Sequence, residues 1–271
     1  MRLNFRVIIG LVIAAVTLLG YFFNTSKNPV TGESQHVNMS ASQEIALGVQ
    51  AAPEMAQQYG GESRDARATA AVQQVGQRIV QANNLAQKTQ YQYRFHLLAD
   101  DQTINAFALP GGQVFITQGL LKNLTSEAQL AGVLAHEVGH VVGRHSAEQV
   151  AQSQLTQGLT GAAAIASYDP NSPGSSVARA AAAAMIAKLV SLRFSRNDEL
   201  EADKFAVQLT PPAGYDPRAM INVMEMLDKK GGSGSQPEFL STHPNPGNRI
   251  GELQKDIQQQ YPQGVPGGLH P

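Results

Sequence analysis

The chain has 271 residues, of which 42% are hydrophobic and 15% charged, a formal net charge of -1 and no cysteine. This composition is typical of a folded globular protein and excludes a disordered chain. The near-neutral charge provides no basic field to attract nucleic acid, which we exclude as a partner. Because cysteine is absent, any bound metal must be held by histidine and carboxylate side chains.

The first predicted element is an apolar run, Val7–Phe23, that follows Arg2 and Arg6. A charged segment before an apolar one is typical of an export signal, and this run is at the short end of the roughly 17–25 residues that span a bilayer. Because no small-x-small cleavage site follows at Tyr21–Asn24, we expect an uncleaved signal anchor. A cleaved signal peptide is the alternative, and in both cases the rest of the chain is exported.

The next predicted elements are two helices and a small sheet. Helical periodicity predicts helices over Gln43–Tyr59 and Arg64–Ala82. The alternation of apolar and polar residues over Tyr91–Leu97 predicts a half-buried strand. Two apolar runs, Ala106–Leu109 and Val114–Thr117, flank a Pro-Gly-Gly turn signal. A small β-sheet therefore precedes the central helix.

The central helix is predicted to begin at Ser126, where Gln129 completes a capping-box pattern, and to continue past Arg144 towards Gln157. Four further helices are predicted: the Ala-rich Ala180–Leu192, one beginning near Ser195, one beginning at Pro217 with Asp216 as its cap, and a last one carrying Ile250, Leu253 and Ile257. The expected fold is mainly α with a small β-sheet, in the α+β class.

The motif that carries chemistry is HExxH, formed by His136, Glu137 and His140 on the central helix. Residues four apart lie on one face of a helix, so the two imidazoles can bind one tetrahedral Zn²⁺ at about 2.0–2.1 Å. Glu137 projects beside them without binding the metal and is placed to act as general base. The alternative is a chance pair of histidines on a solvated helix, and the apolar flanks argue against it.

A catalytic zinc needs a third protein ligand. The metzincin pattern HExxHxxGxxH fits Gly143 but places Ser146 where the third histidine would stand. His145 would lie about 140° round an unbroken helix from His140, because a helix has 3.6 residues per turn. We therefore interpret His145 as a structural residue that forms a hydrogen bond or a cap, and not as a ligand.

A later acidic segment contains a better third ligand. Glu199 and Asp203 are four residues apart, on a helical face that also carries the small Ala202 and Ala206. Glu199 would bind the metal, and Asp203 would accept an imidazole N–H from a ligand histidine. Glu201 remains a rival ligand. The alternative is that these acidic residues bind no metal and only stabilise the start of a helix, where the helix dipole favours negative charge.

HExxH followed by Glu199-x-x-x-Asp203 resembles the CAAX prenyl protease / HtpX-type zinc metallopeptidases, and the resemblance covers roughly residues 40–253. Asn105–Gly112 leading into Val114–Thr117 is similar to the sheet segment before that family's metal helix. The resemblance implies a mostly helical fold with a small sheet. It also implies one Zn²⁺ per chain with Glu199 as the third ligand.

Thr242-His243-Pro244 with Arg249 resembles a C-terminal motif of the branch that includes the BepA- and LoiP-type periplasmic quality-control peptidases. The resemblance implies that His243 approaches the zinc, as a latent-state fourth ligand or as a catalytic helper. A surface-loop histidine is the alternative. Arg249 would stabilise transition-state charge or form a surface ion pair. The chain departs from the family in having one apolar anchor segment, where HtpX has several, and no lipidated cysteine.

These observations predict four segments: a membrane anchor or signal sequence over 1–28, a linker over 29–40, a metallopeptidase domain over 41–257 and a flexible tail over 258–271. The expected function is zinc-dependent cleavage of peptide bonds by a periplasmic domain tethered to the bacterial inner membrane. The resemblance implies that the substrates are misfolded or unassembled envelope proteins. An extended substrate would pair with the strand Val114–Thr117 if that strand is exposed. The alternative function is a membrane-anchored chaperone or assembly factor whose zinc site is latent or structural.

Overall fold

The computed structural model describes residues 5–37, 39–166, 194–232, 237–244 and 247–271. The chain divides into two compact units, one formed by Met1–Met39 with Ser146–Ser191 and the other by Ser40–His145 with Leu192–Pro271. The predicted helix Ala180–Leu192 lies outside the described residues.

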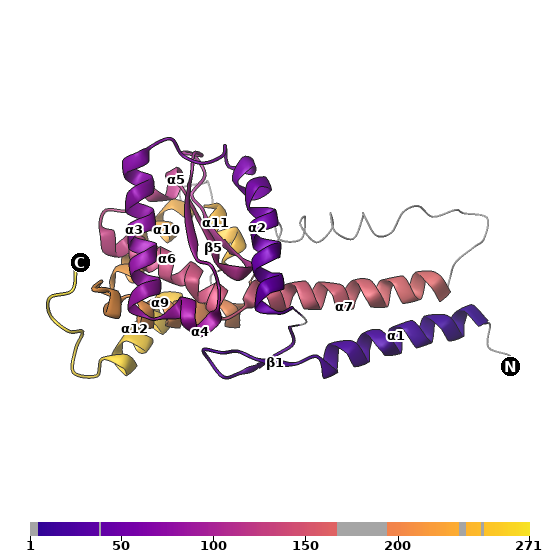
Figure 1. Ribbon diagram of the computed structural model, residues 1–271. Coiled ribbons are helices and arrows are strands. Elements are labelled where there is room, and N and C mark those ends of the chain that lie inside the picture. Colours follow the sequence, from indigo (N-terminus) through magenta and orange to yellow (C-terminus); the bar gives the residue numbers. More distant parts are fainter. Residues whose placement is uncertain (1–4, 38, 167–193, 233–236, 245–246) are drawn as a thin grey trace. The chain divides into compact units, whose positions relative to one another are not determined.

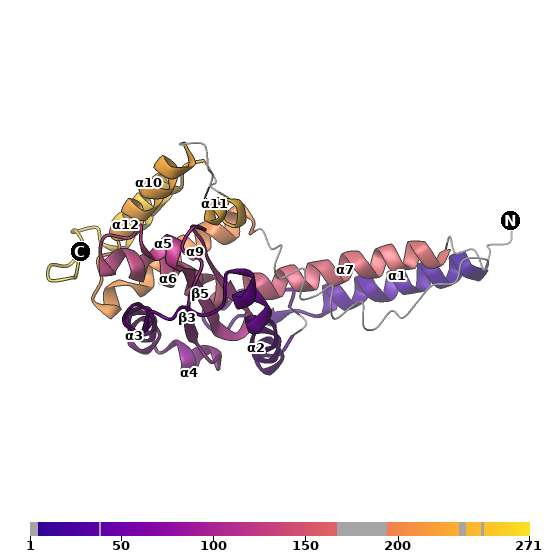
Figure 2. The same cartoon turned by 90° about the horizontal axis from the view of Figure 1, so that it is seen from above.

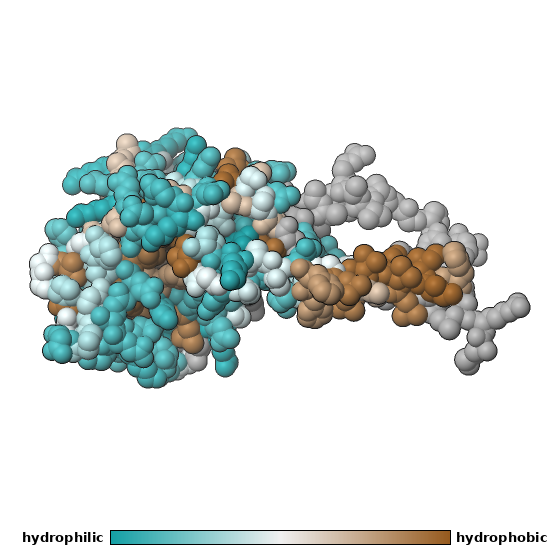
Figure 3. Space-filling view, turned by 60° about the horizontal axis from the view of Figure 1, so that its bottom comes forward, coloured by the Kyte–Doolittle hydropathy of each residue, from teal (hydrophilic) through white to brown (hydrophobic). Residues whose placement is uncertain are grey.

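The first unit contains α1 (Phe5–Phe23), most of α7 (His145–Ala166) and a hairpin of β1 (Ser26–Lys27) with β2 (Ser34–Gln35). α1 and α7 lie side by side in both ribbon views (Figures 1 and 2). Apolar side chains gather on the surface of α1 (Figure 3), and the exposed ones include Leu11, Val16, Leu19, Phe22 and Phe23. Among the helices of the described residues, none is both long and apolar enough to cross a bilayer, so the transmembrane prediction is not confirmed.

The second unit contains a three-stranded sheet in the order β3-β5-β4. β5 (Gln113–Thr117) runs parallel to β3 (Arg94–Leu98) and antiparallel to β4 (Ala106–Leu109), with Phe115 opposite both His96 and Phe107. The expectation that Val114–Thr117 is an exposed strand is wrong, because β5 is the central strand and is paired along both edges. β4 is an edge strand, with β5 as its one partner among the described strands.

Helices surround this sheet, so the predicted α+β class is confirmed (Figure 1). α6 (Glu127–Val142) lies between the sheet and the later helices (Figure 2). The other helical elements of the unit are α2 (Ala41–Gln58), α3 (Ala66–Ala82), α4 (Leu85–Thr89), η1 (Pro110–Gly112), α5 (Gln118–Leu121), α9 (Arg196–Leu209), η2 (Pro211–Ala213), α10 (Ala219–Gly231), α11 (Glu238–Thr242) and α12 (Arg249–Gln260).

The start of α6 follows from local hydrogen bonding. The Ser126 hydroxyl accepts a hydrogen bond from the Gln129 backbone N–H, as predicted. The Gln129 side chain accepts a hydrogen bond from the backbone N–H of Thr125, at 2.6 Å. In a capping box it would accept from the backbone N–H of Ser126 instead, so the bond is shifted by one residue. Every residue from Leu130 to Val142 is buried, so α6 is a core helix and not a solvated one.

The end of α6 differs from the prediction. The helix ends at Val142, and Arg144 adopts a left-handed backbone conformation, with φ of 59°, before α7 begins at His145. The buried Arg144 guanidinium pairs with Glu44 of α2, with Nε 3.1 Å from Oε1. Tyr91 donates a hydrogen bond to the other oxygen of Glu44, at 2.8 Å. A continuous helix past Arg144 is therefore wrong, because the ion pair with α2 holds the chain in a turn.

α10 also begins later than predicted, at Ala219 and not at Pro217. The Asp216 carboxylate accepts a hydrogen bond from the Arg218 backbone N–H at 2.8 Å and pairs with the Arg218 side chain. These bonds hold Asp216–Arg218 in a turn before the helix. The chain after α12 returns to this turn, where His270 forms an isolated β-bridge with Tyr215.

Candidate metal centre

Four buried side chains of the second unit converge on one point. His136 and His140 come from α6, Glu199 from α9, and His243 from the residue that caps α11. One nitrogen or oxygen of each lies within 4.8 Å of the others. The structure thus brings together all three predicted ligands and the fourth candidate, which is buried and not on a surface loop.

The separations between these atoms suit a tetrahedral ion. His136 Nε2 lies 3.1 Å from His140 Nε2, 3.4 Å from His243 Nδ1 and 3.6 Å from Glu199 Oε2. Glu199 Oε1 lies 3.5 Å from His140 Nε2 and 3.0 Å from His243 Nδ1. Ligands held at about 2.0–2.1 Å around a tetrahedral zinc would be about 3.3 Å apart. The four side chains therefore fit a metal ion of this size.

The two helices that carry the ligands approach closely because of small residues. A Cβ built on Gly139 of α6 would lie 2.9 Å from the Phe205 Cβ and 3.0 Å from the backbone of Ala202 on α9. Only glycine permits this approach. The α9 helix begins after Ser195, as predicted, and Ser195 forms a capping box with Asp198. The distance between the α6 histidines and the α9 glutamate is therefore set by helix packing.

Each ligand histidine is oriented by a hydrogen bond at its other nitrogen. His136 Nδ1 lies 3.0 Å from Asp203 Oδ1, as expected for a carboxylate that fixes the tautomer. His140 Nδ1 lies 2.8 Å from His145 Nδ1. The Phe194 ring stacks on His140, with centroids 3.8 Å apart. Phe194 carries no sequence signal that marks it as part of the site, because an aromatic residue before a helix is ordinary core.

Arg249 is buried and not on the surface. Its Nε and Nη2 lie 2.6 and 2.8 Å from the two Asp203 oxygens, and its Nη1 lies 3.0 Å from Glu199 Oε2. Of the two roles considered for Arg249, the surface ion pair is therefore wrong, because the guanidinium is paired inside the site. Burial alone would raise the pKa of Asp203, but Arg249 and His136 lower it to about 2. Burial would likewise raise the pKa of Glu199, but His243 and Arg249 hold it below its ordinary value.

Glu137 is buried beside the cluster and behaves differently from Glu199. Neither of its carboxylate oxygens has a hydrogen-bond partner among the described residues. The nearest ion-pair partner is His243 Nε2, at 3.6 Å. Burial raises the pKa of Glu137 to about 7, and the negative charge of Glu199 adds to this effect. A carboxyl group with this pKa is suited to exchange protons near neutral pH.

His243 lies between the two glutamates. Its Nδ1 faces Glu199, its Nε2 faces Glu137, and its ring stacks on Phe239 with centroids 4.4 Å apart. Burial alone would lower the pKa of His243, but the two carboxylates outweigh this effect and raise it. The position therefore allows either of the two predicted roles, as a latent-state fourth ligand or as a catalytic helper.

The rival third ligand lies elsewhere. The Glu201 side chain is 31% exposed, and its Oε2 contacts His145 Nε2 at 3.1 Å, whereas Glu199 is fully buried among the histidines. Glu199 is thus the carboxylate that the fold presents to His136 and His140.

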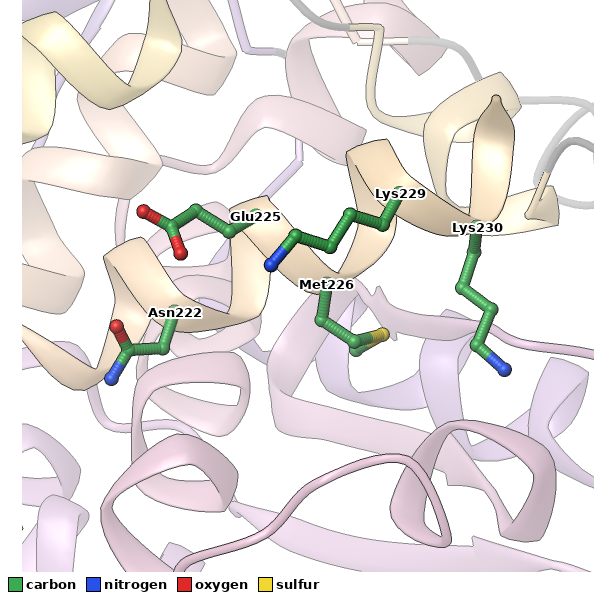
Figure 4. Close-up of a pocket in the computed structure, with 5 residues that line it drawn as sticks. All are labelled: Asn222, Glu225, Met226, Lys229 and Lys230. Carbon is green, nitrogen blue, oxygen red and sulfur yellow. The ribbon is translucent and has the colours of Figure 1, made fainter. Parts of the chain in front are cut away.

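A separate pocket lies on the outer face of α10 (Figure 4). The five side chains drawn there all project from this one helix, and none belongs to the metal cluster: Asn222, Glu225, Met226, Lys229 and Lys230. Because they combine opposite charges with one apolar side chain, they define no recognisable ligand class.

A small sheet, a buried HExxH helix and a convergent carboxylate define a zincin-like metallopeptidase. The sequence profile of peptidase family M48 matches residues 66–257, well over half of the chain, and the protein belongs to this family. The chain is 32% identical over 86% of its length to the "Beta-barrel assembly-enhancing protease" of Yersinia pestis and spans 48% of that protein. It is 31% identical over 93% of its length to the "Mitochondrial metalloendopeptidase OMA1" of Schizosaccharomyces pombe, of which it spans 72%.

A human relative, "Metalloendopeptidase OMA1, mitochondrial", is 29% identical over 88% of this chain, and 47% of the human protein is matched. The chain thus spans about half the length of the beta-barrel assembly-enhancing proteases that it matches. The predicted metallopeptidase class is confirmed at the level of the family, and the buried cluster indicates a metal ion.

Proposed function

We propose that this protein is a zinc-dependent endopeptidase that hydrolyses peptide bonds in misfolded or unassembled proteins of the cell envelope. The observation that carries the proposal is the buried carboxylate of Glu137, which accepts no hydrogen bond from the described residues and lies beside a convergent set of metal-binding atoms. A buried carboxylate without hydrogen bonds is costly, and such groups persist where chemistry requires them. The envelope substrate is supported by the likeness to beta-barrel assembly-enhancing proteases.

In this mechanism His136, His140 and Glu199 would hold the metal ion. When bound, the ion would supply the Lewis acidity that polarises a scissile carbonyl and acidifies a water molecule. Glu137 takes a proton from the attacking water molecule as the oxygen of that water bonds to the carbonyl carbon. The same carboxyl then gives the proton to the leaving nitrogen as the C–N bond breaks. The raised pKa of Glu137 suits both transfers.

We place the substrate at β4, the edge strand of the sheet that packs against α6. The residues of β4 are buried as those of β5 are, but one edge of β4 has no strand partner among the described strands, and β4 packs against α6. An extended segment of substrate would therefore pair with the backbone of Ala106–Leu109 and not with β5. This mode recognises backbone more than side chains, which is consistent with broad specificity.

The test compares the wild type with Glu137→Gln on an unfolded protein substrate. We expect the variant to keep its zinc and lose cleavage, because the amide cannot accept the proton. Equal cleavage by both proteins would remove Glu137 from the mechanism. The third ligand is tested by zinc content: Glu199→Ala should lose stoichiometric zinc. Retention in Glu199→Ala together with complete loss in Glu201→Ala would reverse the assignment.

A second function, that of a chaperone or assembly factor with a latent zinc site, is favoured by one observation. His243 Nδ1 lies among the other ligand atoms, and a fourth protein ligand would occupy the position that a catalytic zinc leaves open. If His243 is a latent-state ligand, His243→Ala should cleave faster than the wild type. Slower cleavage would instead indicate a catalytic helper that acts with Glu137.

We also propose that α1 attaches the chain to the inner membrane, with the metallopeptidase domain, residues 41–257, in the periplasm. The exposed apolar side chains of α1 support this proposal, because such side chains favour lipid over water. Cell fractionation of the full chain tests it. Recovery of the intact protein in the soluble periplasmic fraction would contradict anchoring, and a shortened soluble form would indicate cleavage.

A further inference from the structure

His145 stands beside the metal centre because the chain breaks its helix immediately before it. An unbroken α6 would carry His145 about 140° away from His140. The left-handed conformation of Arg144 turns the chain back, so that the His145 ring meets the His140 ring edge to face, with centroids 5.0 Å apart. Both histidines are buried.

Gly143 makes room for this arrangement. A Cβ built on Gly143 would lie 2.3 Å from His145 Nε2 and 2.7 Å from Cε1. Any other residue at this position would therefore displace the ring. The absence of a side chain at 143 and the turn at Arg144 both serve to place His145 against His140.

The hydrogen bonds of the three groups form one consistent chain. His140 Nε2 faces the other ligands, so it must be unprotonated to bind a metal, and Nδ1 then carries the proton. Nδ1–H donates to His145 Nδ1, 2.8 Å away. His145 must in turn be protonated at Nε2, which donates to Glu201 Oε2 at 3.1 Å. Each donor meets an acceptor, and the chain ends on a carboxylate.

We infer that His145 and Glu201 are positioning residues for the metal centre, acting through His140 without touching metal or substrate. This inference rests on the proposed function. His136 has a direct carboxylate partner in Asp203, whereas His140 reaches its carboxylate through a second imidazole. His145 is not a ligand, because it contacts the nitrogen of His140 that faces away from the cluster. Its two ring nitrogens are both occupied by His140 and Glu201.

The test measures metal affinity in the absence of substrate. The wild type, His145→Ala, His145→Gln and Glu201→Ala are each titrated with Zn²⁺ against a chromophoric chelator at neutral pH. We expect His145→Ala to bind zinc about 10–100-fold more weakly, as for other partners of ligand histidines. Glu201→Ala should fall in the same direction by less, because its side chain is partly exposed. His145→Gln should recover part of the loss, since its amide can both accept and donate.

The Co²⁺-substituted proteins supply a second readout. The visible absorption of bound Co²⁺ reports ligand geometry, so the band should shift in His145→Ala and move back towards the wild type in His145→Gln. His96→Ala is the matched control. His96 lies on β3, outside the metal cluster, and it also forms a hydrogen bond with a glutamate, Glu62, at 2.7 Å. Its zinc affinity and cobalt spectrum should equal those of the wild type.

Folding is checked by thermal unfolding of each metal-free variant. If His145→Ala fails to fold, the comparison of His145→Gln and Glu201→Ala with the wild type decides the question. A folded His145→Ala with zinc affinity within twofold of the wild type and an unshifted cobalt band would overturn the inference, and would leave the proposed peptidase intact. A wild type that binds no stoichiometric metal would overturn both.

Discussion

The packing of α6 against α9 makes a sharp prediction at Gly139. In Gly139→Ala the new Cβ would lie 2.9 Å from the Phe205 Cβ and 3.0 Å from backbone atoms of Ala202. Carbon atoms pack at about 3.5–4.0 Å, so the helices must separate by roughly 0.6 Å. Gly132→Ala is the matched control on the same helix. Its Cβ would meet the flexible Met220 side chain at 3.4 Å, which is close to ordinary contact.

The expected difference follows from two opposing effects. Each substitution gains about 0.8–1.0 kcal/mol of helix propensity. Gly139→Ala also incurs an overpacking cost of about 1–3 kcal/mol, which Gly132→Ala avoids. The free energies of unfolding of the two variants should therefore differ by about 1–3 kcal/mol. At about 2–4 °C per kcal/mol for a domain of this size, Gly139→Ala should melt about 2–12 °C below Gly132→Ala.

The separation of α6 from α9 should also weaken metal binding. His140 lies on α6 and Glu199 on α9, and ligand distances in a zinc site tolerate shifts of only about 0.2 Å. We expect Gly139→Ala to lose at least about tenfold in zinc affinity, while Gly132→Ala keeps the wild-type value. Calorimetry of the metal-free proteins and zinc competition assays measure the two effects. Equal melting temperatures and equal affinities for the two variants would refute the close-packing argument.

Three further predictions concern the site. The kcat/KM–pH profile should fall on its acid side with a midpoint at or below about pH 7, because Glu137, whose pKa burial raises to about 7, loses its base form as pH falls. A bound dication would lower that pKa further. Activity that stays unchanged down to pH 4 would contradict this prediction. Chelation should lower the melting temperature, since zinc at a hundredfold excess over its Kd stabilises the fold by about 2.7 kcal/mol. Asp203→Asn should destabilise the chelated protein by about 3–5 kcal/mol in denaturant titrations, because it leaves Arg249 charged, buried and half unpaired.

The parts of the site that depend on local structure could be predicted from the sequence. The spacing of His136 and His140 places both on one helical face whatever the rest of the chain does. The hydroxyl of Ser126 begins that helix through a bond to a residue three positions later. Ser195 begins α9 in the same way, through Asp198. Each of these features spans at most one helical turn, so the local sequence is sufficient to determine it.

Features that depend on distant contacts were harder to predict. Both Glu199 and Glu201 lie in an acidic segment, and the choice between them depends on which face of α9 meets Gly139. The exposed strand was misassigned because strand order is set by pairing across the sheet. β4 and β5 have similar apolar sequences, and only the parallel pairing of β5 with β3 leaves β4 at the edge.

The position of His145 shows how a distant residue decides a local question. In a continuous helix, the side chain of His145, five residues after His140, would point away from the metal. Arg144 departs from it at a cost of about 1–2 kcal/mol for a left-handed backbone. Its charged hydrogen bonds to Glu44, one hundred residues earlier, contribute about 1.5–3 kcal/mol. The bonds to α2 are thus of the size needed to offset the cost of the left-handed backbone, and the break that they stabilise brings His145 to His140.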